Sequence, residues 1–276
     1  MKLARFERGN GPEVGVVEGE QIHPTHFLSM ISAIEGGVQP GGSPPVALSD
    51  VRLLAPVGRP GKIFAIGLNY ADHIAESKMD TPQTQVWFAK APTAVNGPYD
   101  PIPIADGAPY VDYEAEMVAV IGKRGKYISE ADAKDYVFGY CVGNDVTERH
   151  WQHRVPQWTL GKSFDGHAPI GPWITTADEI DDPHALDISL SVNGETRQSS
   201  NTRHLVFDLW QQISHLSHAM TLEPGDLIFT GTPGGVGAAM DPRQFLQPGD
   251  VVRVEIEALG HIEGTMEAER SAEWTA

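Results

Sequence analysis

The sequence predicts a strand-rich α+β protein. Short apolar runs with the spacing of β-strands recur along most of the chain, whereas only a few short segments have helical periodicity. Strands and helices do not alternate regularly, as they do in doubly wound proteins. The 276 residues include 29 Gly and 21 Pro, which is typical of a turn-rich globular protein. This length suits one large domain with a small companion.

Residues 1–58 are predicted to form a small β-rich domain. Its expected elements are strands at Lys2–Phe6, Glu13–Glu18 and Gln21–His23, followed by a short helix at His26–Ile34. A Gly/Pro stretch from Gly36 to Pro45 then indicates a loop or linker. The pattern changes after the turn residues at 56–61, so we expect a larger second domain over residues 59–276.

The second domain is predicted to be built mainly from short strands. These are expected at Lys62–Gly67, Val86–Ala89, Glu114–Ile121, Val137–Val142, Ile188–Val192, Leu227–Thr230 and Asp250–Ile256. Helical patterns occur at Glu130–Lys134 and His204–Met220, and a short polar helix is expected after Tyr70. Because Tyr70–Met79 lacks a wide apolar face, we expect it to act as a lid that closes over a ligand.

Charge and cysteine content exclude several classes of protein. The 37 acidic and 20 basic residues give a formal net charge of −17, which argues against nucleic-acid and anionic-membrane partners. The single cysteine, Cys141, cannot form an intrachain disulfide, so a reducing compartment is expected. The charged Met1–Arg8 segment is unlike a signal peptide, and no run approaches the ~20 apolar residues of a membrane span. We therefore expect a cytoplasmic protein.

Three carboxylates predict a metal site. Glu114 and Glu116 are two residues apart in a predicted strand, so they point to the same face beside a hydrophobic core. Two buried like charges repel each other unless a cation lies between them. Asp145 follows another predicted strand. Such a set of oxygen ligands is typical of Mg²⁺ or Mn²⁺, and it points to a metal-dependent enzyme.

Other polar residues have both a functional and a structural interpretation. Lys162 lies among small and apolar residues, so it is either a surface side chain or a positive centre for an anionic ligand. The glycine-rich segment 230–237 is either a turn or a ligand loop. His73 and Glu76 would share one helix face, where a carboxylate can orient an imidazole as a general base, although such pairs are usually solvated. No motif supports a serine nucleophile or a zinc site.

Taken together, these motifs resemble the fumarylacetoacetate hydrolase family. The resemblance extends in order over about residues 60 to 260, and one departure is His150, where relatives usually carry aspartate. The matching motifs are Gly67–His73 with Glu76, Asp112–Glu116, Gly143–Arg149, Gln152, Gly161–Asp165, Gly171–Pro172, Val192–Gly194, Pro224–Asp226 and Thr230–Pro233.

The resemblance implies a mixed β-roll or sandwich fold, usually a homodimer, with Mg²⁺ or Mn²⁺ and a 2-oxo or 2,4-dioxo acid substrate. It implies hydrolysis of a carbon–carbon bond in an acylpyruvate-like acid through an enolate held by the metal. The implied roles are metal ligation by Glu114, Glu116 and Asp145, catalysis by His73, Glu76 and Lys162, and substrate binding by Tyr70, Arg149, Gln152 and Thr232.

Three alternatives stay open at this point. The shared residues also suit a decarboxylase or an enol–keto isomerase of a dicarboxylic 2-oxo acid such as oxaloacetate. A metal-dependent binding protein without catalysis is the third, although such a protein would not need both a base and an enolate stabiliser. The distal end of the substrate is expected to meet the loop from His150 to Thr159, whose tryptophans, histidines and Arg154 suit either an apolar or an anionic group. The same loop is equally suited to a dimer interface.

Overall fold

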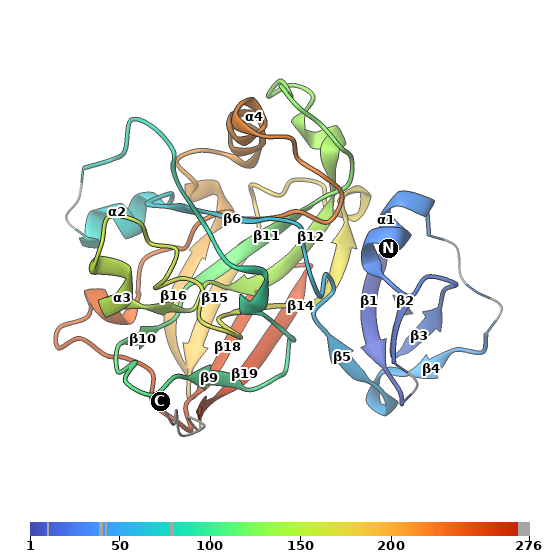
Figure 1. Ribbon diagram of the computed structural model, residues 1–276, viewed down its shortest axis with the longest axis horizontal. Helices are drawn as coiled ribbons and strands as arrows, with labels where there is room; N and C mark the ends of the chain where they lie inside the picture. Colours follow the sequence, from blue (N-terminus) through green and yellow to red (C-terminus); the bar gives the residue numbers. More distant parts are fainter. Residues whose placement is uncertain (10, 39–40, 42, 78–79, 270–276) are drawn as a thin grey trace, which may run out of the picture.

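The protein is built around one large and one small β-sheet, as the computed structural model shows (Figure 1). It describes residues 1–9, 11–38, 41, 43–77 and 80–269. The strands of the large sheet are β1 (Lys2–Glu7), β2 (Pro12–Glu18), β3 (Gln21–Pro24), β4 (Val46–Ala47), β5 (Arg52–Leu54), β6 (Ile63–Gly67), β7 (Val86–Ala89), β8 (Val95–Asn96), β11 (Ala115–Ile121), β12 (Val137–Asn144), β14 (Ala168–Thr176) and β17 (Leu227–Phe229).

The small sheet packs over one face of the large one and encloses a shared core. Its strands are β9 (Ile102–Ile104), β15 (Asp187–Val192), β16 (Glu195–Asn201), β18 (Val251–Ile256) and β19 (Gly260–Ala268). A separate pair is formed by β10 (Val111–Asp112) and β13 (Thr147–Glu148). The helices are α1 (Met30–Gly36), α2 (Ala71–Ser77), α3 (Arg149–His153) and α4 (Leu209–Ala219). The predicted predominance of strands over helices is confirmed.

Strand β11 shows how the sequence divides its side chains between two cores. Met117, Ala119 and Ile121 belong to the core between the two sheets, where they meet residues of β15, β18 and α4. Val118 and Val120 belong to the core on the opposite face. Because side chains alternate along a strand, Glu114 and Glu116 fall on the face of Val118 and Val120. The register of β11 therefore decides which core the two acids border.

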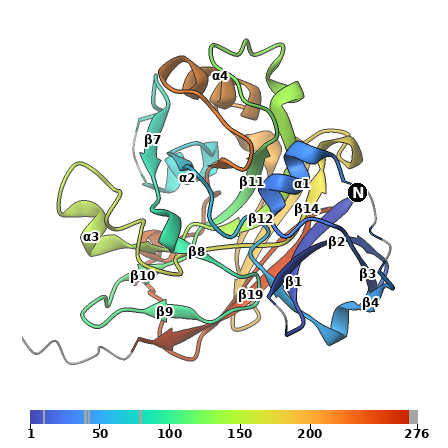
Figure 2. The ribbon, with the colours of Figure 1, turned by 45° about the vertical axis from the view of Figure 1, so that its right-hand side comes forward.

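The first strands of the chain continue the large sheet. Strands β4, β3, β2 and β1 lie in this order at one end, and β1 pairs with β14 through Lys2 with Thr175 and Leu3 with Ile174 (Figures 1 and 2). Leu3 shares a core with residues of β6, β11 and β17. The proposed division into residues 1–58 and 59–276 stays a prediction. Part of the predicted loop at Gly36–Pro45 lies outside the described residues.

Three predicted helices differ from the structure in their bounds or type. The predicted helix at His204–Met220 begins only at Leu209, because the Asp208 side chain caps its first turn and the Gln211 side chain accepts a hydrogen bond from the Asp208 N–H. The first helix starts at Met30, because the Ser29 side chain caps it.

The helix expected at Glu130–Lys134 is wrong. Residues Ala133–Tyr136 form a single 3₁₀ turn instead, because Val137 already begins β12. Within the part of the chain that the structure describes, no helix combines the length and the apolar character needed to cross a bilayer.

Candidate active site

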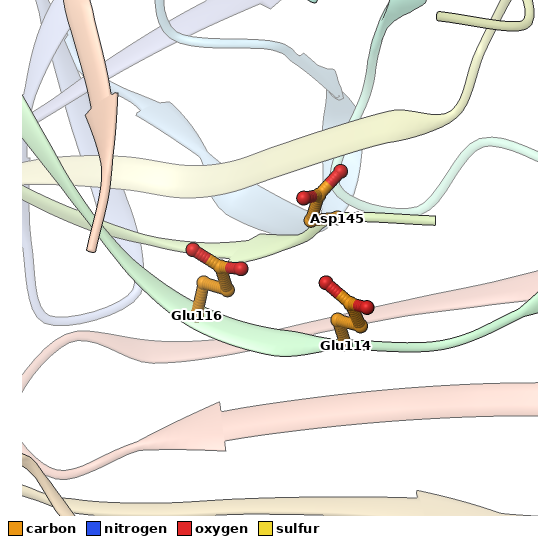
Figure 3. A group of neighbouring side chains, drawn as sticks. All are labelled: Glu114, Glu116 and Asp145. Carbon is orange, nitrogen blue, oxygen red and sulfur yellow. The ribbon is translucent and has the colours of Figure 1, made fainter. Parts of the chain in front are cut away.

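The pairing of β11 with β12 brings the three predicted metal ligands together. Ala115 lies opposite Asn144, so Glu114 falls beside Asp145, whose N–H donates to the Glu114 carbonyl at 2.9 Å. Figure 3 shows Glu114 and Glu116 on the same side of one strand, with Asp145 next to them. One oxygen from each of Glu114, Glu116 and Asp145 lies within 4.8 Å of the others, and all three residues are buried. The cluster therefore forms where the start of β11 lies beside the end of its antiparallel neighbour β12.

Lys162 and Arg149 neutralise part of this cluster. The Lys162 Nζ lies 2.6 Å from Glu114 Oε2 and 2.8 Å from Asp145 Oδ2. The Arg149 guanidinium lies 2.7 Å from Glu114 Oε1 and 2.8 Å from Asp112 Oδ2. Asp112 also accepts N–H bonds from Gly237 and Ala238, which fixes it in place. Lys162 is therefore a buried positive centre, and its surface interpretation does not hold.

Lys90 is a further buried cation that the sequence analysis missed. It follows β7, its side chain is fully buried, and its Nζ lies 2.6 Å from Asp145 Oδ1. The same ammonium group donates to the backbone carbonyls of Val146 and Lys162. Both oxygens of Asp145 are thus bonded to lysines, which fixes the orientation of this carboxylate.

The electrostatic balance of the cluster leaves one carboxylate without a cation. Burial alone raises a carboxyl pKa, but the charges of Lys162 and Arg149 bring the pKa of Glu114 down to about 2. Burial and the negative charges of Asp145 and Glu114 instead raise the pKa of Glu116 well above its usual value. Glu116 has no ion-pair partner among the described residues and accepts a hydrogen bond from Gly231 N–H at 2.7 Å.

The donor set fits a divalent ion. Four buried carboxylates, including Asp112, face the three cations Lys90, Arg149 and Lys162. When all four carboxylates are ionised, the local sum is one negative charge, which a bound cation would offset. Carboxylate oxygens at this spacing are the ligands that Mg²⁺ and Mn²⁺ prefer. The hydroxyl of Tyr70 is buried without a hydrogen-bond partner among the described residues, and burial together with the Glu116 charge raises its pKa. An unpaired buried hydroxyl beside Glu116 leaves a donor for a ligand.

His73 and Glu76 form a pair on α2. The His73 Nδ1 lies 2.8 Å from Glu76 Oε1, and the other Glu76 oxygen accepts a hydrogen bond from Gly235 N–H at 2.7 Å. His73 is near enough to Glu114 to contribute to its lowered pKa. Because Glu76 occupies Nδ1, the Nε2 of His73 is the ring nitrogen left to exchange a proton.

The remaining predicted residues border the same cluster. Gln152 accepts a hydrogen bond from Arg149 at 3.1 Å. Arg149 Nη2, although close to Asp112, is buried without a well-aligned hydrogen bond, so it retains donor capacity. Thr232 follows Gly231, whose N–H binds Glu116, and its hydroxyl accepts a hydrogen bond from Gln198 at 2.8 Å. The glycine-rich loop therefore lies at the carboxylates.

The loop from His150 to Thr159 was expected to contact the distal end of the substrate, but some of its side chains pack against other parts of the protein. Trp158 packs against Phe88 with tilted rings whose centroids are 5.6 Å apart, and its ring occupies the space that a Cβ at Gly67 would need. Arg154 covers the ring of Trp151 at 4.8 Å. Trp158 is partly buried and packs against the core, and Arg154 is exposed, so only the exposed part of this loop remains for a substrate or a second subunit.

Comparison with known proteins identifies related sequences for nearly the whole chain. Residues 62–267 match the family model described as "Fumarylacetoacetate (FAA) hydrolase C-terminal", and residues 1–56 match one described as "Rv2993c-like, N-terminal". The chain is 43% identical over 268 residues to the mitochondrial oxaloacetate tautomerase FAHD2A of Bos taurus, covering 93% of this chain and 85% of that protein.

Two solved structures show the same fold. A fumarylacetoacetate hydrolase from Exiguobacterium antarcticum has a TM-score of 0.87 and 38% identity, and the match covers 98% of this chain and 100% of that one. A maleylpyruvate hydrolase from Sphingobium sp. SYK-6, in complex with manganese(II) and pyruvate, has a TM-score of 0.83 and 34% identity with the same coverage. These matches confirm the predicted fold class.

Proposed function

The chain belongs to the fumarylacetoacetate hydrolase family, and we propose that it is a divalent-metal-dependent hydrolase that cleaves a carbon–carbon bond in an acylpyruvate-like or 2,4-dioxo acid. One observation carries this proposal. The buried carboxylates Glu114, Glu116 and Asp145 share a site with the bonded pair His73–Glu76. A site with only one of these two parts would suit a binding protein.

In this proposal Glu114, Glu116 and Asp145 hold Mg²⁺ or Mn²⁺. When bound, the ion supplies a Lewis acid for the carboxylate and the adjacent oxo group of the substrate. The manganese and pyruvate bound by the Sphingobium relative support this chemistry for the present chain. Arg149, Gln152, Thr232 and the free hydroxyl of Tyr70 then orient the substrate through hydrogen bonds.

His73 acts as the base in the proposed reaction. Oriented by Glu76, it takes a proton from a water molecule that attacks the 4-oxo carbon. The bond between C3 and C4 then breaks, and its electron pair stays with C3 as the enolate of the 2-oxo acid. The ammonium group of Lys162 stabilises the negative charge, and the proton held by His73 returns to C3. The products are a carboxylic acid and a 2-oxo acid.

Enol–keto tautomerisation of oxaloacetate is the second candidate. The observation that favours it is the 43% identity to a protein named oxaloacetate tautomerase. The same residues suffice, because His73 would move a proton between the enol oxygen and C3 without attack by water. The two reactions differ because hydrolysis breaks the carbon–carbon bond between C3 and C4, whereas tautomerisation only moves a proton.

A substrate panel tests these alternatives. The protein, loaded with Mg²⁺ or Mn²⁺, is given acylpyruvates and the enol form of oxaloacetate in H₂¹⁸O, and products are identified by NMR and mass spectrometry. Hydrolysis yields pyruvate and a carboxylic acid that carries ¹⁸O. Accelerated ketonisation without cleavage supports the tautomerase, and binding without any turnover supports a metal-dependent binding protein. His73→Ala serves as the inactive reference and His215→Ala, at an exposed position, as the matched control.

We also propose that the chain works as a homodimer in the cytoplasm and that the distal group of its substrate is polar. The family resemblance supports the dimer, the single cysteine supports a reducing compartment, and the donors of the 150–159 loop support the polar group. Sedimentation equilibrium tests the dimer. Comparing kcat/KM for acylpyruvates with methyl, carboxylate and phenyl tails, in wild type and Arg154→Ala, tests the distal group.

A further inference from the structure

We propose that Gln198 is a positioning residue that makes the hydroxyl of Thr232 a hydrogen-bond donor to the bound acid. This inference rests on the proposed function, because it assigns the direction of one hydrogen bond in that same site. Gln198 lies on strand β16 of the small sheet, among other polar side chains.

The Gln198 side chain crosses from the small sheet to the candidate active site. It is completely buried, and its Oε1 accepts a hydrogen bond from the Ala115 N–H at 2.9 Å. Its Nε2 donates to Thr232 Oγ1 at 2.8 Å and to the Pro233 carbonyl at 2.7 Å. Ala115 lies between the ligands Glu114 and Glu116, so one amide links the carboxylate strand to the glycine-rich loop.

The chemistry of its neighbours fixes which way the amide faces. The backbone N–H of Ala115 can only donate, so it must meet the oxygen of the amide. The carbonyl of Pro233 can only accept, so it must meet the NH₂ group. A flipped amide would lose both bonds, which removes the usual ambiguity in placing glutamine oxygen and nitrogen. The second hydrogen of the NH₂ group is then the one given to Thr232.

This assignment determines what Thr232 can do. Because its oxygen accepts from Gln198, the hydroxyl proton is free for another partner, and no described residue accepts it. Thr232 is 5% exposed, and the neighbouring Gly231 binds Glu116, so the hydroxyl lies beside the proposed ligands. A donor in this position binds a carboxylate or carbonyl oxygen and does not bind an ammonium group.

Ligand binding in a double-mutant cycle tests the proposal. Thr232→Val, Gln198→Met and the double variant are loaded with Mn²⁺, and pyruvate affinity is measured by calorimetry. Each single change is expected to weaken pyruvate binding about tenfold. The double variant is expected to bind no worse than either single one, because Gln198 acts through Thr232. Gln21→Met, at an exposed position of β3, is the control and should bind as wild type.

Several outcomes overturn the inference. Losses that multiply in the double variant show that Gln198 does not act through Thr232, and unchanged affinity in a folded Gln198→Met shows that it does not act at all. If Gln198→Met does not fold, Thr232→Ser and Thr232→Val decide the donor role. Serine keeps the hydroxyl and should bind within a few fold of wild type, whereas equal affinity of the valine variant and wild type overturns the inference. Failure to turn over any acid, with this coupling intact, counts against the proposed function alone.

Discussion

The carboxylate cluster and the His73–Glu76 pair lie in one site but are held in different ways. Glu114, Glu116 and Asp145 come from paired strands in the centre of the large sheet, and buried cations fix two of them. His73 and Glu76 lie on the seven-residue helix α2, with side chains that are 15% and 25% exposed. The cluster is therefore part of the folded core, whereas the pair lies on a helix at the rim of the site.

Helix α2 lies at the rim of the site and is held by buried side chains and by hydrogen bonds. Ile74 in the helix and Tyr70 just before it are buried, Asp72 accepts a hydrogen bond from Ser200, and Glu76 accepts one from Gly235. These contacts suit an element that can move without disturbing the sheet. The predicted lid extends to Met79, and residues 78–79 lie outside the described part of the chain, so closure stays a prediction. Hydrogen exchange of α2 with and without oxalate tests it, and equal protection in both states contradicts it.

Loss of a ligand should have the largest effect. We expect Glu116→Ala to abolish turnover and to weaken Mn²⁺ binding by more than about 100-fold, because even residues that only support a ligand cost 10- to 100-fold. Calorimetry with Mn²⁺ measures the affinity, and Glu130→Ala at an exposed position is the matched control. Wild-type metal affinity in a folded Glu116→Ala would exclude this metal site.

Changes on α2 should affect rate without affecting metal or fold. We expect His73→Ala and Glu76→Gln to lower kcat by about 10²- to 10⁴-fold, the usual contribution of a general base. Mn²⁺ affinity and the midpoint of urea unfolding should stay close to wild-type values, because in the described structure the hydrogen bonds of these two side chains go to each other and to Gly235, and not to the three carboxylates. If metal affinity fell together with kcat, the His73–Glu76 pair and the carboxylate cluster would not be independent of each other.

Removing the charge of Lys90 should lower the stability of the fold. We expect Lys90→Met to lower the free energy of unfolding by about 3–5 kcal/mol, because it leaves the buried charge of Asp145 with one fewer cation. Urea unfolding measures the change, and Lys123→Met at an exposed position is the control. A loss no larger than in the control would show that Asp145 does not depend on Lys90.

The buried side chain of His167 should make the stability of the fold depend on pH. Its Nε2 donates to the Pro103 carbonyl, and burial lowers its pKa from 6.5 to about 4. Between these values the unfolded chain binds a proton that the folded chain does not, so stability is complete above pH 6.5 and falls toward pH 4. The expected loss is about 3 kcal/mol. In His167→Gln this part of the loss should disappear from urea titrations at pH 7, 5.5 and 4, whereas exposed His215→Gln should retain it.

Features that depend only on neighbouring residues in the chain could be predicted from the sequence. Glu114 and Glu116 share a face because side chains alternate along any strand, and most strand positions follow from the same period. For Asp145 the sequence indicates only that it follows a second strand. The pairing of Ala115 with Asn144, which makes the two ends meet, is a property of the folded sheet.

Lys90 and Gln198 show why the rest could not be predicted. A lysine after a short strand has the pattern of an exposed strand end, and only contact with Asp145, 55 residues away, makes it a core residue. Gln198 lies on a largely polar strand, and its partners come from β11 and the glycine-rich loop. Strand β14 was missed because Gly171-Pro172 interrupts a run that would otherwise be read as a strand. Such contacts depend on packing between distant segments.

The continuation of the large sheet into β1 bears on how the chain avoids aggregation. The start of β1 pairs with Ile174 and Thr175 near the end of β14, and the apolar side chains of Leu3, Val14 and Met30 share a core with residues of β6, β11 and β17. A chain that began at residue 59 would bare both an unpaired strand edge and an apolar face. Exposed edges of this kind template pairing with other molecules. We therefore expect residues 1–58 to protect this edge and this apolar face from aggregation.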